Sequence, residues 1–272
     1  MTTWRSEPEP DLPQINAMGW VRVILRGSLL LVLILVCLVV LLILRLIERP
    51  IFGQGRPWSP FMAQIVCRAA FVITGIRLIS EGVPMRHAGG AVANHSSWLD
   101  IFALNARARI FFVSKSEVAD WPGIGVLARA TGTVFIARKS SDARAQKLSF
   151  EQRLSAGHRL MFFPEGTSTD GFRVLSFKST LFAAFFNQNL SRDLWIQPIS
   201  VRYKAPFGAG GQFYGWWGDM DFAPHLLAVL AASPQGSVRV IYHDPLRVAD
   251  FADRKALTRS CEDKVREGFE RA

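Results

Sequence analysis

A histidine and an aspartate five positions apart are the residues of this sequence best suited to acid–base chemistry. They lie in Asn94-His95-Ser96-Ser97-Trp98-Leu99-Asp100, directly after the short apolar run Ala91–Ala93, which we expect to be a strand. A turn after a strand places His95 at the carboxyl edge of the sheet, where open α/β sheets bind their ligands. Asp100 can fold back to accept a hydrogen bond from one imidazole nitrogen, which leaves the other nitrogen as a base near neutral pH.

Such a base suits acyl transfer to an alcohol, because an unactivated hydroxyl is too weak a nucleophile to attack a thioester. Taken alone, a pair with this spacing is more often structural, since it can simply cap the turn. Two further hypotheses stay open: a lipid-binding protein without activity, and a metal-dependent esterase that uses His95, Asp100 and Glu165. The presence of both His95 and Asp100 favours an enzyme, and insensitivity to chelators would exclude the esterase.

Two other polar segments follow expected strands. The segment 162–169 ends a strand in a tight loop, where Glu165 and the hydroxyl of Thr167 are placed to bind a polar headgroup. The segment 132–139 delivers Arg138 to a strand end, and its planar guanidinium can bind phosphate or carboxylate through two hydrogen bonds. Each segment alone is more often an ordinary turn or a solvated surface.

The order and spacing of these motifs resemble the bacterial family of 1-acylglycerol-3-phosphate acyltransferases and their lysophospholipid-acylating relatives. The shared patterns are N-H-x-x-x-x-D, G-x-x-F-I-x-R, F-P-E-G-T and a proline-bearing strand, here Ile196–Ser200, and the resemblance covers roughly residues 60–245. It implies that His95 is the base and that Asp100 orients it. The residues that it implies for binding the acceptor are Arg138, Glu165, Gly166, Thr167 and Lys178.

The resemblance also implies the reaction. A fatty acyl group would pass from acyl-CoA or acyl carrier protein to the free hydroxyl of 1-acylglycerol-3-phosphate, giving phosphatidic acid, without a metal or redox cofactor. Three departures concern the acceptor: Ser168 stands where the family often has Arg, Ala137 where it often has Asp, and Ser176 where it usually has Pro. Charged hydrogen bonds contribute about 1.5–3 kcal/mol, so a lost arginine weakens binding of a dianionic headgroup. Lyso-ornithine lipid is therefore the alternative acceptor.

The apolar and polar periodicity predicts an α/β domain with a mixed sheet flanked by helices. Expected strands are Ala91–Ala93, Ile110–Val113, Val134–Ala137, Leu160–Phe163, Trp195–Tyr203 and Val238–His243. Expected helices are Asp142–Ala156, Ser179–Asn189 and Ala252–Phe269.

A membrane anchor is predicted before this domain. Residues Gly27–Leu44 carry no charge and as a helix would span about 27 Å, close to the thickness of a bilayer's hydrocarbon core. A cleaved signal peptide and a buried core helix fit the flanking residues and the apolar surface less well. Phe61–Leu78 suits a helix in the membrane interface, so the two form a hairpin, whether fully spanning or re-entrant. We expect a disordered tail over residues 1–20, anchoring helices over 21–82 and the acyltransferase domain over 83–272.

Charge and cysteine content limit the partners and the compartment. The formal net charge of +10, from 32 Lys and Arg against 22 Asp and Glu, favours anionic partners. The apolar stretch favours membrane lipids over nucleic acid among them. Three widely spaced cysteines exclude a disulfide framework, and neither the cysteines nor the histidines have the spacing of a metal site. We therefore expect a catalytic domain that faces the cytoplasm from the cell inner membrane, with membrane lipids and the acyl donor as partners.

Overall fold

Eight strands of the described chain form one mixed sheet. The computed structural model describes residues 3–136, 143–186 and 193–272, with the backbone alone for 143–147. The strands are β1 (Arg77–Glu81), β2 (Gly89–Ala93), β3 (Phe111–Lys115), β4 (Val134–Ile136), β5 (Arg159–Phe162), β6 (Trp195–Lys204), β7 (Ser237–Tyr242) and β8 (Leu246–Arg247). Their order across the sheet is β1-β7-β6-β2-β5-β3-β4, and β8 pairs with β6. The predicted mixed α/β sheet is confirmed.

The strands that carry the site run parallel at the centre of the sheet. β2 pairs in parallel with β5 on one side and with β6 on the other. β7 and β8 run antiparallel to β6, and β1 runs parallel to β7. Every residue of β2 is buried, as expected for a central strand that is covered on both faces. The loops that follow β2 and β5 therefore meet at one edge of the sheet, which brings His95 and Glu165 together.

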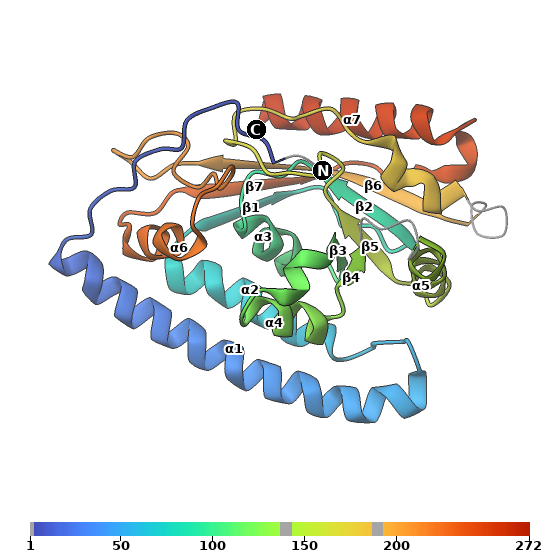
Figure 1. Cartoon of the computed structure of the whole chain (residues 1–272), viewed down its shortest axis with the longest axis horizontal. Coiled ribbons are helices and arrows are strands. Elements are labelled where there is room, and N and C mark those ends of the chain that lie inside the picture. Colours follow the sequence, from blue (N-terminus) through green and yellow to red (C-terminus); the bar gives the residue numbers. More distant parts are fainter. Residues whose placement is uncertain (1–2, 137–142, 187–192) are drawn as a thin grey trace.

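Helices cover both faces of the sheet. They are α1 (Ala17–Phe52), α2 (Pro60–Thr74), α3 (Leu99–Arg107), α4 (Ile124–Thr131), α5 (Ala143–Ser155), α6 (Phe222–Ala231) and α7 (Arg254–Arg271), with 3-10 helices at Ser116–Asp120, Ser179–Phe186 and Val248–Asp250. Figure 1 shows α7 above the sheet, and α2 and α3 below it with α1 underneath. Each face has its own core, with Phe71 and Leu104 in the lower one and Phe182, Leu257 and Val265 in the upper one.

The predicted elements are largely present. The six predicted strands correspond to β2 to β7 with nearly the same bounds, and the predicted helices near residues 142–156 and 252–269 correspond to α5 and α7. The helix predicted over 179–189 is a 3-10 helix over Ser179–Phe186, and its last positions lie outside the described residues. Neither β1 nor β8 was predicted, and the short helices α3, α4 and α6 were also missed.

The second anchoring helix is shorter than predicted. α2 ends at Thr74 because Gly75 adopts a left-handed conformation, with φ of 84°, and its N–H caps the carbonyl of Phe71. The following residues form β1, which pairs with β7 through Arg77 and Ser237. The range 21–82 predicted for anchoring helices therefore extends too far, because its last residues belong to the sheet.

The apolar helix α1 packs lengthwise against the domain. Among the described residues it is the helix that is long and apolar enough to cross a membrane, and most of its large apolar side chains are exposed. It packs against α2 and α6, which agrees with the predicted helix pair. Near its start, Arg22 and Arg26 donate hydrogen bonds to the last carbonyls of α6, including Ala231 and Leu230. These two cations therefore stabilise the carboxyl end of α6.

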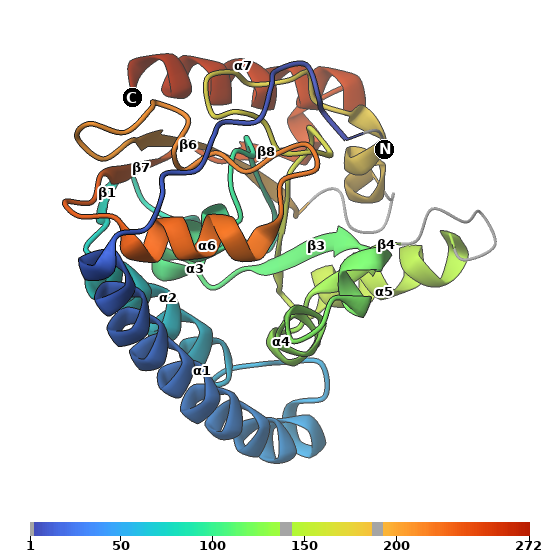
Figure 2. The same cartoon turned by 60° about the vertical axis from the view of Figure 1, so that its left-hand side comes forward.

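The N-terminal segment differs from the predicted disordered tail. Residues 3–16 run in an extended path beside the loops at the carboxyl edge, and α1 begins at Ala17 (Figures 1 and 2). Arg5 pairs with Asp219 at 2.8 Å, and Glu7 pairs with Arg173 at 2.9 Å. The acidic and proline-rich composition predicted disorder, but in the structure Glu7 pairs with Arg173 and Glu9 accepts the backbone N–H of Asp219, both far away in the sequence.

Candidate active site

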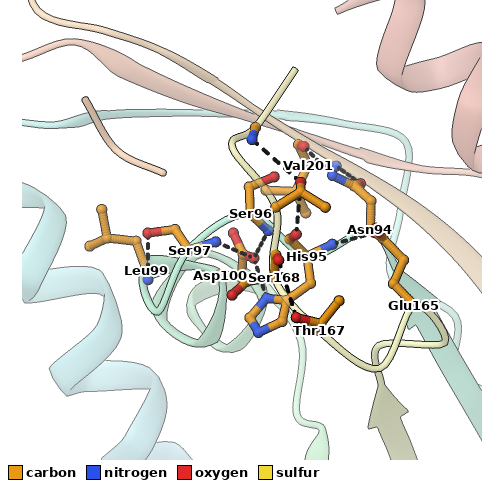
Figure 3. Close-up of polar contacts among 12 residues, drawn as sticks. Asn94, His95, Ser96, Ser97, Leu99, Asp100, Glu165, Thr167, Ser168 and Val201 are labelled. Atoms are coloured by element: carbon orange, nitrogen blue, oxygen red, sulfur yellow. Dashed lines mark hydrogen bonds and ion pairs between the residues drawn. The ribbon is translucent and has the colours of Figure 1, made fainter. Parts of the chain in front are cut away.

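His95 and Asp100 form the hydrogen-bonded pair that their spacing predicts. His95 follows β2 directly, and Asp100 lies in the first turn of α3. The distance between His95 Nδ1 and Asp100 Oδ2 is 2.7 Å. Figure 3 shows the imidazole and the carboxylate side by side at the start of α3. The turn between the two elements is therefore what makes the pair.

Asp100 accepts three further hydrogen bonds. Its Oδ2 accepts the backbone N–H groups of Ser96 at 2.8 Å and Ser97 at 3.1 Å, and its Oδ1 accepts the hydroxyl of Tyr203 at 2.7 Å. Because the fully buried carboxylate accepts hydrogen bonds from all these donors, His95 Nδ1 is the protonated nitrogen of the imidazole. The other nitrogen, Nε2, is then free to accept a proton.

The ring of His95 is accessible but fixed. Its side chain is 20% exposed, whereas that of Asp100 is fully buried. The imidazole stacks on Phe163, with ring centroids 3.9 Å apart and planes at 9°. Within the described part of the chain, Nε2 makes no hydrogen bond. The imidazole is therefore held in one orientation while part of it stays accessible to solvent.

Asn94 joins the site to the middle of β6. Its amide group donates to the carbonyl of Val201 and accepts the N–H of the same residue, both at 2.8 Å. On the other side, Thr169 donates its backbone N–H to the carbonyl of His95 at 3.0 Å. The backbone around His95 is thus held by β6 on one side and by the loop after β5 on the other.

Glu165 holds two loops together. Its Oε1 accepts the backbone N–H of His95 at 2.8 Å, and its Oε2 accepts that of Leu175 at 2.9 Å. The residue is 1% exposed, and burial raises the pKa of the carboxyl to about 8, although both N–H donors act in the opposite direction. The structure thus gives Glu165 a bracing role, and its contact with a headgroup stays a prediction.

The other residues predicted to bind the acceptor lie in different settings. Gly166 has φ of 73°, which a glycine adopts without strain, and this allows the tight loop. Thr167 Oγ1 lies beside His95 (Figure 3) and accepts the backbone N–H of Trp4 at 3.1 Å. Lys178 is half-buried, and its N–H donates to the carbonyl of Pro164. Arg138 lies outside the described residues.

A group of charged residues beside this loop was missed. Arg173 pairs with Asp170 and with Glu7 of the N-terminal segment, each at 2.9 Å. Its guanidinium also lies 5.1 Å from the ring centre of Trp4. Sequence spacing links Arg173 only to Asp170, so nothing local pointed to the N-terminal partners.

Other residues of the site come from distant segments. Tyr203 reaches Asp100 from β6, and Trp98 donates its indole N–H to His225 Nδ1 at 2.9 Å. Burial lowers the pKa of His225, which keeps it a neutral acceptor for this bond. Its Nε2 in turn lies 3.1 Å from the carbonyl of Phe213. The pairs Tyr203–Asp100 and Trp98–His225 are more than 100 positions apart in the sequence, so no motif spacing reveals them.

The three residues of the metal-dependent esterase hypothesis do not offer a metal site. Both oxygens of Asp100 and both oxygens of Glu165 already accept N–H or O–H groups. Within the described ranges, no group of three or more metal-ligating side chains converges. The donor set at His95 therefore fits proton transfer rather than metal binding.

Known acyltransferases are similar to this chain in sequence and in fold. A family model described as Acyltransferase matches residues 78–202. A lyso-ornithine lipid O-acyltransferase from Rhodobacter capsulatus is 53% identical over 263 residues, which cover 97% of this chain and 95% of that relative. A 1-acyl-sn-glycerol-3-phosphate acyltransferase from Neisseria meningitidis serogroup B is 30% identical over 175 residues, covering 64% and 66% respectively. The crystal structure of the 1-acyl-sn-glycerophosphate acyltransferase PlsC from Thermotoga maritima has the same fold, with a TM-score of 0.59 at 20% identity, covering 90% and 97%.

Proposed function

The chain belongs to the acyltransferase family that acylates lysophospholipids and related lysolipids, and we propose that its acceptor is lyso-ornithine lipid. The observation that carries this proposal is the 53% identity to the Rhodobacter capsulatus enzyme along almost the whole chain. The similarity to an enzyme that acts on 1-acyl-sn-glycerol-3-phosphate is weaker and shorter. The motifs alone favoured that phosphate-bearing acceptor, so the proposal reverses the order of the two candidates.

The charges beside the loop that follows β5, residues 163–169 and here called the headgroup loop, support the same acceptor. Ornithine bears an ammonium and a carboxylate, whereas a phosphate monoester can carry two negative charges. Arg173 is already paired with Asp170 and Glu7, so acidic and basic groups alternate here. Ser168 adds no charge where the related phosphate-binding enzymes often have an arginine. A mixed set of charges complements a zwitterion better than it complements a dianion.

The reaction proposed is direct transfer from a bound acyl thioester to the bound lysolipid. His95 Nε2 takes the proton of the acceptor hydroxyl, and the oxygen adds to the carbonyl carbon of an acyl thioester. The tetrahedral intermediate then collapses, the carbon–sulfur bond breaks, and the imidazolium returns its proton to the departing thiolate. Asp100 stabilises the imidazolium and holds its orientation, because it accepts the hydrogen bond from Nδ1–H throughout.

The donor and the location are further parts of the proposal. The acyl donor is acyl-CoA or acyl carrier protein, and both present the same thioester. The exposed apolar side chains of α1 hold the enzyme on a membrane. Cys37, Cys67 and Cys261 are buried and free, which fits a reducing compartment and a catalytic domain facing the cytoplasm from the inner membrane.

A direct comparison of acceptors tests the proposal. The purified full chain in detergent is given a labelled acyl thioester with lyso-ornithine lipid or 1-acylglycerol-3-phosphate, each with acyl-CoA and with acyl carrier protein as donor. We expect kcat/KM for lyso-ornithine lipid to exceed that for 1-acylglycerol-3-phosphate, and His95→Ala to remove both activities. Faster acylation of 1-acylglycerol-3-phosphate would overturn the choice of acceptor and leave the reaction class in place.

A variant at the headgroup loop makes the test sharper. Ser168→Arg restores the cation that the phosphate-binding relatives often have at this position. One charged hydrogen bond of about 1.5–3 kcal/mol corresponds to about tenfold or more in affinity. The ratio of kcat/KM values should therefore shift toward 1-acylglycerol-3-phosphate by about tenfold. An unchanged ratio would show that this position does not contact the headgroup.

A further inference from the structure

A cavity of about 370 Å³ lies at the edge of the sheet opposite His95. It opens where the connection between α1 and α2 meets the start of β5. Its walls include Phe52, Arg56, Arg109, His158 and Arg159. β5 begins at the cavity and ends next to the loop of Glu165, so a strand of about 13 Å separates the two sites. The cavity is therefore not part of the acyl transfer site.

The walls of the cavity carry an excess of positive charge. Three arginines line it, and none of the described residues in its walls is a carboxylate. A fourth arginine, Arg153, lies behind the wall and donates from Nε to His158 Nδ1 at 2.6 Å. None of the four forms an ion pair with another described residue. The carboxylate of Glu48, which attracts Arg56, is already bound by Arg45 and by two backbone N–H groups.

Arg56 is held in place, and its buried Nε has no partner among the described residues. Its Nη1 donates to the carbonyl of Ala130 at 2.9 Å, and its guanidinium lies against Gly132, where an added Cβ would be 2.7 Å from Cζ. Burial lowers the pKa of Arg56 to about 10, which still leaves the side chain charged at neutral pH. Nε is closed off from solvent, so an anion in the cavity would bind the other N–H groups of this guanidinium, which pairs with no described carboxylate.

The cavity opens beside the carboxyl end of α1, where several large apolar side chains are exposed. Phe52 at its rim is 45% exposed, and the neighbouring Ile51, Trp58 and Phe61 are also exposed. Arg109 lies over the ring of Phe61 with its guanidinium 4.9 Å from the ring centre. Exposed aromatic and aliphatic groups beside arginines are typical of surfaces that meet the lipid headgroup region.

We propose that this cavity binds the phosphate of an anionic phospholipid whose acyl chains lie along the exposed carboxyl end of α1. Arg56, Arg109 and Arg159 surround the phosphate, and guanidinium groups bind phosphate oxygens through paired hydrogen bonds. The volume is within the range of small-ligand sites. The phosphates of a soluble acyl donor share this chemistry, but the apolar rim and the position beside α1 favour a lipid. The proposal does not depend on which lysolipid the enzyme acylates.

Native mass spectrometry of the full chain in neutral detergent tests the site. Dioleoylphosphatidylglycerol and dioleoylphosphatidylcholine are titrated separately, and coenzyme A and inorganic phosphate are tested as soluble phosphate sources. We expect phosphatidylglycerol to bind at least tenfold more tightly than phosphatidylcholine, whose choline cation would meet the arginines. Arg56→Gln should remove most of this preference, and Arg109→Gln, at an exposed side chain, should reduce it without a change in folding.

A charge-matched control separates binding in the cavity from general electrostatic attraction. The variant Arg259→Gln removes one exposed cation from α7, on the other face of the sheet. It should bind phosphatidylglycerol as the unaltered protein does. Equal binding of the two lipids, or an equal loss in the α7 control, would overturn the proposal. Tighter binding of coenzyme A than of phosphatidylglycerol would also overturn it, because the phosphate would then belong to a soluble donor.

Discussion

The hydroxyl of Tyr203 is the most informative contact of the site to remove. Tyr203 lies on β6 and donates to Asp100 Oδ1 at 2.7 Å, while the other carboxylate oxygen binds His95. Burial, together with the carboxylate, raises the pKa of Tyr203 well above its ordinary value, so the phenol stays a donor at any pH of assay. Tyr203→Phe keeps the ring and removes this donor from a fully buried carboxylate.

The expected loss follows from the number of donors that remain. A hydrogen bond to a charged group contributes about 1.5–3 kcal/mol, and 1.4 kcal/mol corresponds to tenfold in rate. Asp100 keeps the N–H groups of Ser96 and Ser97 and its bond to His95, so we expect the lower end of this range. We expect kcat to fall about tenfold with little change in KM, because the hydroxyl of Tyr203 is bound to Asp100 and acts on the pair instead of on the acceptor. The melting temperature should also fall.

Tyr242→Phe is the matched control. Tyr242 lies on β7 and is buried, and its hydroxyl has no hydrogen-bond partner in the described part of the chain. The same chemical change there should leave kcat unaltered. Initial rates with a labelled acyl thioester and saturating lysolipid measure both variants. If Tyr203→Phe and Tyr242→Phe have the same kcat, the hydrogen bond from β6 does not serve the His95–Asp100 pair.

Two further predictions concern the frame of the site and its acid sensitivity. Glu165→Gln turns one acceptor oxygen into an N–H donor facing a backbone N–H, so we expect a loss of about 1–3 kcal/mol in unfolding free energy and a lower kcat, measured by thermal melting and initial rates. Burial and the nearby Arg153 lower the pKa of His158 to about 4, so the unfolded chain takes up a proton first as the pH falls from about 6.5 to 4. The native protein should lose roughly 2 kcal/mol of unfolding free energy over this range through His158. Melting curves of His158→Gln should lack this part of the pH dependence. Equal pH dependence of the two proteins would contradict the lowered pKa of His158.

Local patterns predicted the core of the site, because the residues concerned are close in sequence. A turn between β2 and α3 is enough to bring His95 to Asp100, and a spacing of five positions is what such a turn requires. The same holds for the glycine that closes the loop after β5. The pairing of His95 with Asp100 is confirmed by the structure, whereas the part of these two residues in catalysis stays a prediction.

Long-range partners were not predictable, because nothing local records them. Tyr203 and Val201 stand more than 100 positions from the residues that they bind, and their side chains look like ordinary members of a strand. The acidic N-terminal segment has the composition of a disordered tail, yet Glu7 finds Arg173 across the fold. β1 was missed because only Gly75 and Ile76 separate it from an apolar helix.

The central claim is that the imidazole of His95, oriented by Asp100, removes the proton of the lysolipid hydroxyl. Single-turnover transfer from a labelled acyl thioester to lyso-ornithine lipid, measured for the native protein, His95→Ala and Asp100→Asn, tests it most directly. General-base catalysis contributes about 10²–10⁴ in rate, so we expect losses of this size in both variants with the thermal melting of His95→Ala unchanged. Transfer by folded His95→Ala at the native rate would contradict the claim.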